Sequence, residues 1–414
     1  MEEKEQRSNI NEILPLELIQ IILLRVPAKH LARLRFVSKL WHSLISDPHF
    51  AKLHFNHSPA ATNTNACLYK RHGGSVAYFV YLDALFGDDN DASSLVKEVS
   101  LPFEMKEFCY PVVLGSCRGF VLLDEIDRDS HFLVVWNPLT GSGKKISNPY
   151  ASPSDPHGFG VSSGSLIHMY GFGYLASHDD YFVVVGWKDV EWQPHMDCFS
   201  LRSNSWINID AALPKPLGSF ESNSCGLFLN GAIHWLYARL EDFGDAILIL
   251  DLKERTFSRI STPEQLVMSE CAYMKLTILA GCLALYYQKY YSLNTEIWVM
   301  KEYKVQSSWT LYEIPSGDFR PLCISNNGDI IGDQFLFDNI EQQIKFSIYN
   351  VSEGQLQRFK HHCFKGYMSS TDAMYTESLL PLPTDIKDKK KKERKEIGHQ
   401  VRHECFEQLD IAKG

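Results

Sequence analysis

The sequence has no C-x-x-C pair among its ten cysteines, and the spacings between them match no zinc-binding pattern. Several cysteines stand within apolar runs, such as Cys282 in "LAGCLALYY" (279–287). Cysteines in such surroundings are typically buried thiols. We therefore expect reduced cysteines in a reducing compartment, with no disulfide framework and no bound metal or other cofactor.

Three further absences limit the class of protein. The N-terminus, "MEEKEQRSN", is acidic and polar and does not resemble a signal peptide. No run approaches the ~18 apolar residues that are needed to cross a bilayer. The 414 residues carry a net charge of -9, which argues against a general nucleic-acid binder. We expect a protein of the cytoplasm, the nucleus or both, without membrane or nucleic-acid partners.

Apolar residues are concentrated near the N-terminus, where 20 of the 37 residues from 14 to 50 are apolar. Pro15 suits the first position of a helix that ends before Pro27. A second helix is predicted over residues 29–36 and a third over 38–46, with Ser38 as its N-cap. The pair Asp47-Pro48 is interpreted as the end of the third helix. Because the first helix is apolar nearly all round, it must be buried on most of its sides.

Three short helices cannot normally form a stable core by themselves. Their surplus apolar surface either packs on the rest of the chain or docks on the helices of a second protein. The helical pattern alone leaves both alternatives open.

The residues themselves favour the second alternative, because the segment resembles the F-box of plant F-box proteins. The match runs without gaps through "LP" (14–15), "RVPAK" (25–29), "RLR" (33–35) and "SLISDP" (43–48). The resemblance implies binding to the Skp-type adaptor of a cullin-RING ubiquitin ligase. The adaptor contacts would come from Leu14, Pro15, Leu18, Ile22, Val26, Leu31, Leu34, Val37 and Trp41. Each of these positions, Trp41 above all, could instead hold the three helices together.

From residue 66 onward, short apolar runs bounded by Gly, Asn, Asp and Pro are typical of β-strands. Five segments share the order strand, polar turn, strand: 133–147, 198–209, 248–260, 298–314 and 347–359, with a weaker sixth copy at 78–103. Their aligned aromatic residues, Trp206, Phe257, Trp309 and Phe359, are 51, 52 and 50 residues apart. A period near 50 is typical of kelch-type propeller blades. We predict about six blades, with seven blades or a distorted ring as alternatives.

The β region also resembles the F-box-associated domain that follows this F-box in plants. Matching motifs include "GSCRGFVLL" (115–123), "WNPLTG" (136–141), "LNGAIHWL" (229–236) and "PLCISNNGDII" (321–331). The predicted fold class is multidomain: a small all-α F-box followed by an all-β, propeller-like domain. The predicted segments are a disordered N-terminus (1–12), the F-box (13–50), a linker (51–65), the propeller (66–382) and a charged tail (383–414).

The two resemblances together imply a non-catalytic, substrate-recognition subunit of an SCF-type ubiquitin ligase. Its partners would be the adaptor, through it the cullin scaffold and the RING protein, and an unidentified target that is ubiquitinated and degraded. The alternatives are a scaffold or a receptor for a glycan or small ligand without a role in degradation, and a propeller enzyme. Loops 148–165 and 288–295 are candidate target-binding segments.

Four local patterns resemble catalytic, ligand-binding or signalling motifs. "GVSSG" (160–164) fits a nucleophile motif centred on Ser162 but lies in a Ser/Gly/Pro loop with no following helix. "GSGKK" (141–145) fails as a phosphate loop and is better explained as a hairpin turn. His234 is interpreted as a satisfied core histidine. The basic run "KDKKKKERKE" (387–396) is a solvated tail or, alternatively, a nuclear-import patch.

Overall fold

The computed structural model describes residues 14–57, 65–70, 76–82, 96–102, 112–127, 130–148, 166–189, 191, 193–210, 224–237, 246–267, 270–338, 341–365 and 373–383. The predicted N-terminal segment 1–12 and the charged tail from residue 384 lie outside the described residues. So does loop 149–165 with Ser162.

Four short helices precede the β domain: α2 (Leu16–Leu23), α3 (Ala28–Leu34), α4 (Lys39–Ile45) and α5 (Pro48–His57). The three predicted helices are present, and Ser38 caps α4 by accepting a hydrogen bond from the Trp41 amide (3.2 Å). No helix in the described part of the chain is long and apolar enough to cross a membrane.

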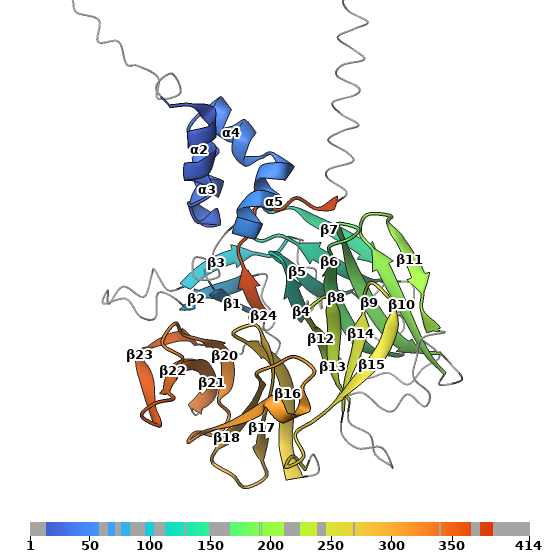
Figure 1. Ribbon diagram of the computed structural model, residues 1–414, viewed down its shortest axis with the longest axis vertical. Helices are drawn as coiled ribbons and strands as arrows, with labels where there is room; N and C mark the ends of the chain where they lie inside the picture. The colour runs from blue at the N-terminus through green and yellow to red at the C-terminus, as the bar shows by residue number, and fades with distance from the viewer. Residues whose placement is uncertain are drawn as a thin grey trace, which may run out of the picture.

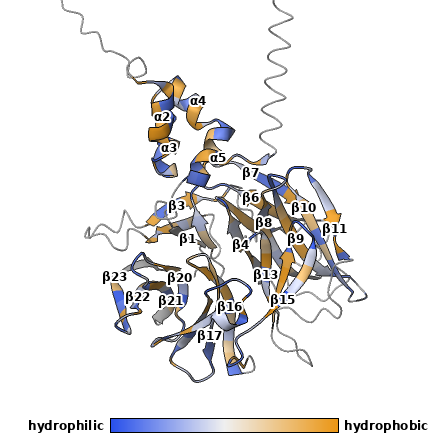
Figure 2. Cartoon of the chain, in the orientation of Figure 1, coloured by the Kyte–Doolittle hydropathy of each residue, from blue (hydrophilic) through white to orange (hydrophobic). Residues whose placement is uncertain are grey.

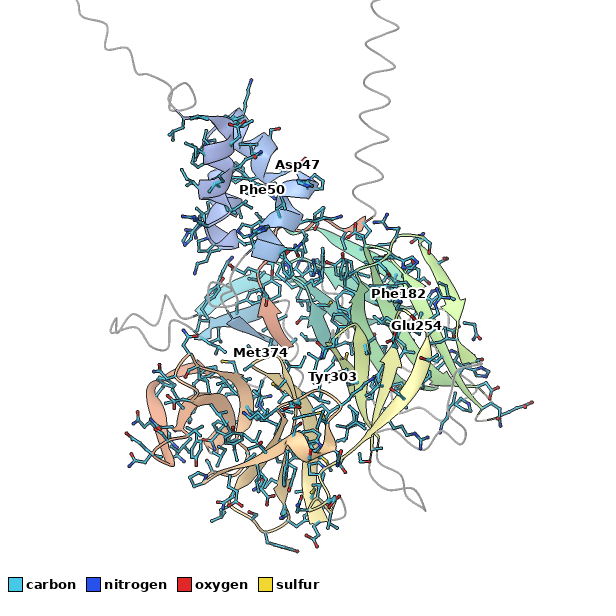
Figure 3. The ribbon with its side chains drawn as sticks, in the orientation of Figure 1. Asp47, Phe50, Phe182, Glu254, Tyr303 and Met374 are labelled. Carbon is cyan, nitrogen blue, oxygen red and sulfur yellow. The ribbon has the colours of Figure 1, made fainter. Side chains whose placement is uncertain are left out.

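Helix α5 corrects the prediction that residues 51–65 form a linker from end to end. The side chain of Asp47 accepts hydrogen bonds from the amides of His49 (2.8 Å) and Phe50 (2.9 Å), and Pro48 is the first helical residue. An aspartate N-cap followed by proline is a helix start signal. The pair Asp47-Pro48, which we interpreted only as an end, therefore also begins a new helix (Figure 3).

The β domain contains 24 strands among the described residues. They are β1 (Asn65–Lys70), β2 (Val76–Tyr81), β3 (Val96–Ser100), β4 (Val112–Cys117), β5 (Phe120–Asp127), β6 (Ser130–Trp136), β7 (Gly143–Ser147), β8 (Leu166–Leu175), β9 (Asp180–Lys188), β10 (Pro194–Ser200), β11 (Ser205–Asn208), β12 (Ser224–Leu229), β13 (Ala232–Tyr237), β14 (Ala246–Asp251), β15 (Thr256–Ser261), β16 (Cys271–Leu279), β17 (Cys282–Lys289), β18 (Thr295–Met300), β19 (Trp309–Ile314), β20 (Arg320–Ile324), β21 (Ile330–Asp338), β22 (Glu341–Asn350), β23 (Gln355–Lys365) and β24 (Ala373–Thr376).

These strands form six four-stranded antiparallel blades arranged in a ring (Figure 1). The first blade takes its innermost strand, β24, from the far end of the chain, where β24 pairs with β1. This pairing closes the ring, and closure protects sheet edges that would otherwise be free to pair with other chains.

The third and fourth blades join into one eight-stranded sheet, because β8 and β12 pair in parallel. Gly171 and Gly226 are opposite each other at this contact. A Cβ atom on Gly171 would lie 2.9 Å from the Trp235 ring, and one on Gly226 would lie 2.5 Å from it. Only glycine therefore lets the two backbones approach beneath the indole ring.

The predicted repeat is confirmed. The five segments with one shared order are the third and fourth strands of their blades, β6–β7, β10–β11, β14–β15, β18–β19 and β22–β23, and the weak copy is β2–β3. The alignment of the last copy is wrong by three residues. The residue of β23 that is equivalent to Trp206 and Phe257 is Leu356, which lies next to the turn and pairs with Tyr349, whereas Phe359 lies further along the strand.

The helical domain rests on the β domain through α5, and α2 and α4 extend away from the ring (Figure 1). Lys29 of α3 adds a contact with the first blade, because its ammonium lies over the ring of Tyr81 (4.9 Å to the centroid). One continuous hydrophobic cluster joins Ile19, Leu23 and Phe50 of the helices to buried residues of the second and third blades. Leu380 and Leu382, from the segment after β24, belong to the same cluster. The segment that follows β24 therefore helps to form the surface on which the helices pack.

Candidate functional site: an apolar helix face above a fixed junction

Helix α2 has an apolar side that faces outward. Ile19 and Leu23, one turn apart, are buried and mark the inner side. Leu18, Ile21 and Ile22 point the other way, and their side chains are 46%, 49% and 52% exposed. The outer side of an ordinary surface helix is polar. Figure 2 shows instead that α2 is largely hydrophobic.

The turn between α3 and α4 adds a second exposed apolar element. Phe36 is 87% exposed and its neighbour Val37 is 63% exposed. Together with Leu16 at the start of α2, these residues make half of the twelve large hydrophobic side chains that are exposed in the described structure. We call Leu16, Leu18, Ile21, Ile22, Phe36 and Val37 the helical apolar surface.

The nine residues predicted to bind an adaptor divide into three groups. The exposed ones are Pro15, Leu18, Ile22 and Val37; the half-buried ones are Leu14, Val26, Leu34 and Trp41; the buried one is Leu31. The half-buried residues pack against the hydrophobic cluster that joins the helices to the propeller, so each contributes to the internal core.

Leu31 follows the second of the two alternatives, because its side chain has no exposed surface in this conformation and holds the helices together. Conversely, Leu16, Ile21 and Phe36 belong to the exposed surface but were missing from the predicted set. In α3 the apolar residues Leu31 and Leu34 stand one turn apart and mark its inner side. The apolar run of α2, in contrast, conceals which of its residues face inward.

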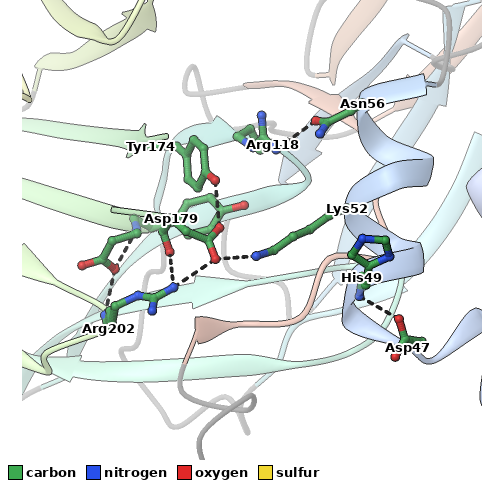
Figure 4. A network of polar contacts seen from close by, with 10 residues as sticks. Asp47, His49, Lys52, Asn56, Arg118, Tyr174, Asp179 and Arg202 are labelled. Carbon is green, nitrogen blue, oxygen red and sulfur yellow. Dashed lines mark hydrogen bonds and ion pairs between the residues drawn. The ribbon is translucent and has the colours of Figure 1, made fainter. Parts of the chain in front are cut away.

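The junction between α5 and the propeller is held by charged side chains (Figure 4). Lys52 of α5 forms an ion pair with Asp179, which lies in the β8–β9 turn (2.5 Å). Asp179 also accepts hydrogen bonds from Tyr174 (2.8 Å) and Arg202 (2.9 Å). Burial alone would raise the pKa of Asp179, but the hydrogen bonds from Lys52 and Tyr174 hold that pKa below its usual value. The carboxylate therefore stays charged and links the helix to two turns of the third blade.

Arg118 forms the other half of the junction. Its guanidinium lies over the ring of Phe55 in α5 (4.4 Å to the centroid) and over the ring of Tyr174 (4.2 Å). It also contacts the side-chain oxygen of Asn56 at 3.5 Å. A guanidinium held between two aromatic faces is a favourable cation–π arrangement.

Two observations bear on the chemistry that the described structure could perform. No three His, Cys, Asp or Glu side chains among the described residues are placed to hold a metal ion. His234 is fully buried, with Nε2 2.8 Å from the Tyr303 hydroxyl and Nδ1 3.2 Å from the Leu227 carbonyl oxygen. Burial lowers the pKa of His234 to about 4, so it is a neutral core residue, as predicted.

Comparison with known families agrees with this architecture. Residues 12–53 match the F-box domain, and residues 80–382 match the F-box associated beta propeller domain. The chain belongs to the F-box proteins that carry an associated β-propeller. An F-box/kelch-repeat protein of Arabidopsis thaliana is 27% identical over 90% of this chain and 96% of its own length. The F-box protein CPR1 of the same plant is 30% identical over 72% of this chain and 71% of its own.

Among solved structures, TolB from Acinetobacter baumannii is similar over 79% of this chain and 72% of its own, with a TM-score of 0.46 and 10% identity. Members of this F-box family are adaptor-type proteins and are not catalysts. The helical apolar surface and the junction are thus features of an F-box protein, and both belong to its F-box domain or to the turns beneath it.

Proposed function

We propose that this F-box protein is the substrate-recognition subunit of an SCF-type ubiquitin ligase. The helical apolar surface would bind a Skp-type adaptor, and through it the cullin scaffold and the RING protein. The propeller would hold a target protein for ubiquitination and proteasomal degradation. The observation that carries the proposal is the outward apolar side of α2, because a contiguous exposed apolar helix face marks a site where another protein binds.

In this proposal the chain accelerates ubiquitin transfer without making or breaking bonds. A target bound to the propeller is kept near the ubiquitin-conjugating enzyme, so an encounter between two molecules becomes a step within one assembly. Such a gain depends on geometry and is lost when the linked sites cannot be reached together. Lys52 and Arg118 support the proposal, because they fix the helical domain on the ring.

The adaptor interaction is tested with the double variant Leu18→Asp/Ile22→Asp. Both residues are about half exposed and face away from the core, so the variant should fold normally. We expect co-purification with a plant Skp-type adaptor to be lost, because two carboxylates would be buried at an apolar interface. The matched control is Val305→Asp/Val351→Asp, which introduces the same charges at exposed valines of the propeller.

Wild-type recovery of adaptor by Leu18→Asp/Ile22→Asp would refute the assignment. The ligase role is then tested by reconstituting the chain with adaptor, cullin, RING protein, conjugating enzyme and ubiquitin. We expect ubiquitin chains to form only when the adaptor-binding residues are intact. Stable adaptor binding without any ubiquitin transfer or any change in protein half-life would instead indicate a scaffold.

A further inference from the structure

The fifth blade carries an unusual group of exposed apolar side chains. Of the six large hydrophobic residues exposed on the described part of the propeller, four come from two connections of this blade. Val267 precedes β16, and Tyr290, Tyr291 and Leu293 lie in the loop between β17 and β18. Tyr291 is fully exposed and Leu293 is 82% exposed. We call these four residues the blade-five tip.

The two connections form one surface, because hydrogen bonds join them. The amide of Tyr290 donates to the carbonyl oxygen of Glu270 (2.9 Å), and the amide of Glu270 donates to the carbonyl oxygen of Val267 (3.0 Å). On the other side, a Cβ atom on Gly317 would lie 3.7 Å from the carbonyl oxygen of Leu293. Glu270 and Asp318, the residue after Gly317, therefore border the tip.

The loop is held in place, although its outward side chains contact little. The side-chain amide of Gln288 donates to the Ser292 carbonyl oxygen (2.7 Å), and the Ser292 hydroxyl accepts from the Asn294 amide (3.1 Å). Tyr291 has a φ of 64°, a left-handed conformation that a bulky residue rarely adopts. Strained backbone of this kind concentrates at sites with a function. A preorganised loop also loses less entropy on binding than a flexible one.

The tip lies on the face of the ring that is opposite α5. Arg118 and Asp179, which contact α5, lie in turns between the first and second strands of their blades. In an antiparallel blade, successive connections alternate between the two faces of the ring. The β17–β18 loop joins a second strand to a third strand, so it is on the other face. A molecule bound at the tip would not meet the helical domain.

The charged residues around the blade-five tip indicate the charge of the partner that it would bind. Glu270 and Asp318 are exposed, and neither forms an ion pair with another described residue. The nearby Lys289 is paired with Glu296 (2.9 Å) and also lies within electrostatic reach of Glu270, so one cation faces three carboxylates around the tip. The border of the tip is therefore negative, and exposed tyrosines are both apolar anchors and good partners for cations.

We propose that the blade-five tip is the docking surface for the target protein, and that it takes a cationic segment of that target with an apolar anchor residue. This inference rests on the proposed role as a substrate receptor, and it adds the surface and the class of ligand. The acidic border would attract the basic side chains, while Tyr291 and Leu293 would cover the anchor.

The experiment uses the full chain co-purified with a Skp-type adaptor and a displayed library of random short peptides. We expect selection of peptides that combine Lys or Arg with an aromatic or aliphatic residue. The variant Tyr291→Ser/Leu293→Ser should bind the selected peptides at least ~30-fold more weakly, as for interface hot spots. The variant Glu270→Gln/Asp318→Asn should bind them more weakly at low salt and with less salt dependence.

The control Val305→Ser/Val351→Ser removes exposed apolar groups elsewhere on the propeller and should bind like wild type. The proposal is overturned by an empty selection, by acidic or uncharged peptides, or by full binding to Tyr291→Ser/Leu293→Ser. It is also overturned if wild type self-associates in sedimentation and this variant does not, since the tip would then join two copies. Adaptor recovery, measured on every variant, shows separately whether the ligase assignment holds.

Discussion

The junction at Arg118 allows a prediction that separates docking of the helical domain from stability of the propeller. Arg118 and Gly119 form the β4–β5 turn, with φ angles of 48° and 82°. Asparagine adopts such left-handed angles more readily than arginine, and Asn-Gly is a favoured hairpin turn. The variant Arg118→Asn should therefore keep the turn while it removes the contacts with Phe55 and Tyr174.

The expected loss of docking energy follows from the contact with Phe55 of α5. Each cation–π contact contributes about 0.5–1 kcal/mol when exposed and about 2 kcal/mol when desolvated. Tyr174 belongs to β8 of the propeller, so only the contact with Phe55 joins Arg118 to α5. Because Arg118 is half-buried, this contact should stabilise docking of α5 by roughly 1–2 kcal/mol. The side-chain contact with Asn56 is exposed and long, and it adds little.

The assay is amide hydrogen exchange of residues 48–57 in the native state. A loss of about 1–2 kcal/mol corresponds to roughly 5- to 30-fold faster exchange through local opening. The matched control is Ala280→Asn, which places asparagine before Gly281 in the equivalent turn of the fifth blade, at a φ of 50°. If Arg118→Asn leaves exchange in α5 at the wild-type rate, Arg118 does not hold the helix and the reasoning is refuted.

Three further predictions concern stability. Leu31→Ala, at a position with no exposed surface, should destabilise the helical domain by ~2–5 kcal/mol in denaturant unfolding. Arg320→Leu should cost ~3–5 kcal/mol, because the buried carboxylate of Asp333 loses its bidentate partner. Hydrogen bonding to Asp210 (2.6 Å) raises the pKa of His195. The stability that this hydrogen bond adds is complete below the pKa of histidine in the unfolded state, and it is lost as pH rises through the higher pKa of the folded state. The variant His195→Asn should therefore flatten the dependence of stability on pH between these two pKa values.

Much of the architecture could be predicted from local patterns. The strand–turn–strand repeat identified the outer half of each blade, and Pro15, Pro27 and Ser38 marked the predicted helices. Helix α5 could not be separated from a linker, because the Asp47-Pro48 pair is compatible with both an end and a start. The burial of Leu23 and the exposure of Ile22 could not be distinguished either, since α2 is apolar on most sides and its sequence does not show which side faces inward.

The amino-acid sequence by itself determined which segments form helices and strands, because capping residues, turn residues and apolar periodicity act within a few neighbouring positions. It also determined the blade repeat, which is a periodic property of the chain. Only the tertiary structure decided the junction of Lys52, Arg118 and Asp179, and the closure of the ring by β24. Those contacts join residues that are distant in the chain, so only the packing of the folded domains brings them together.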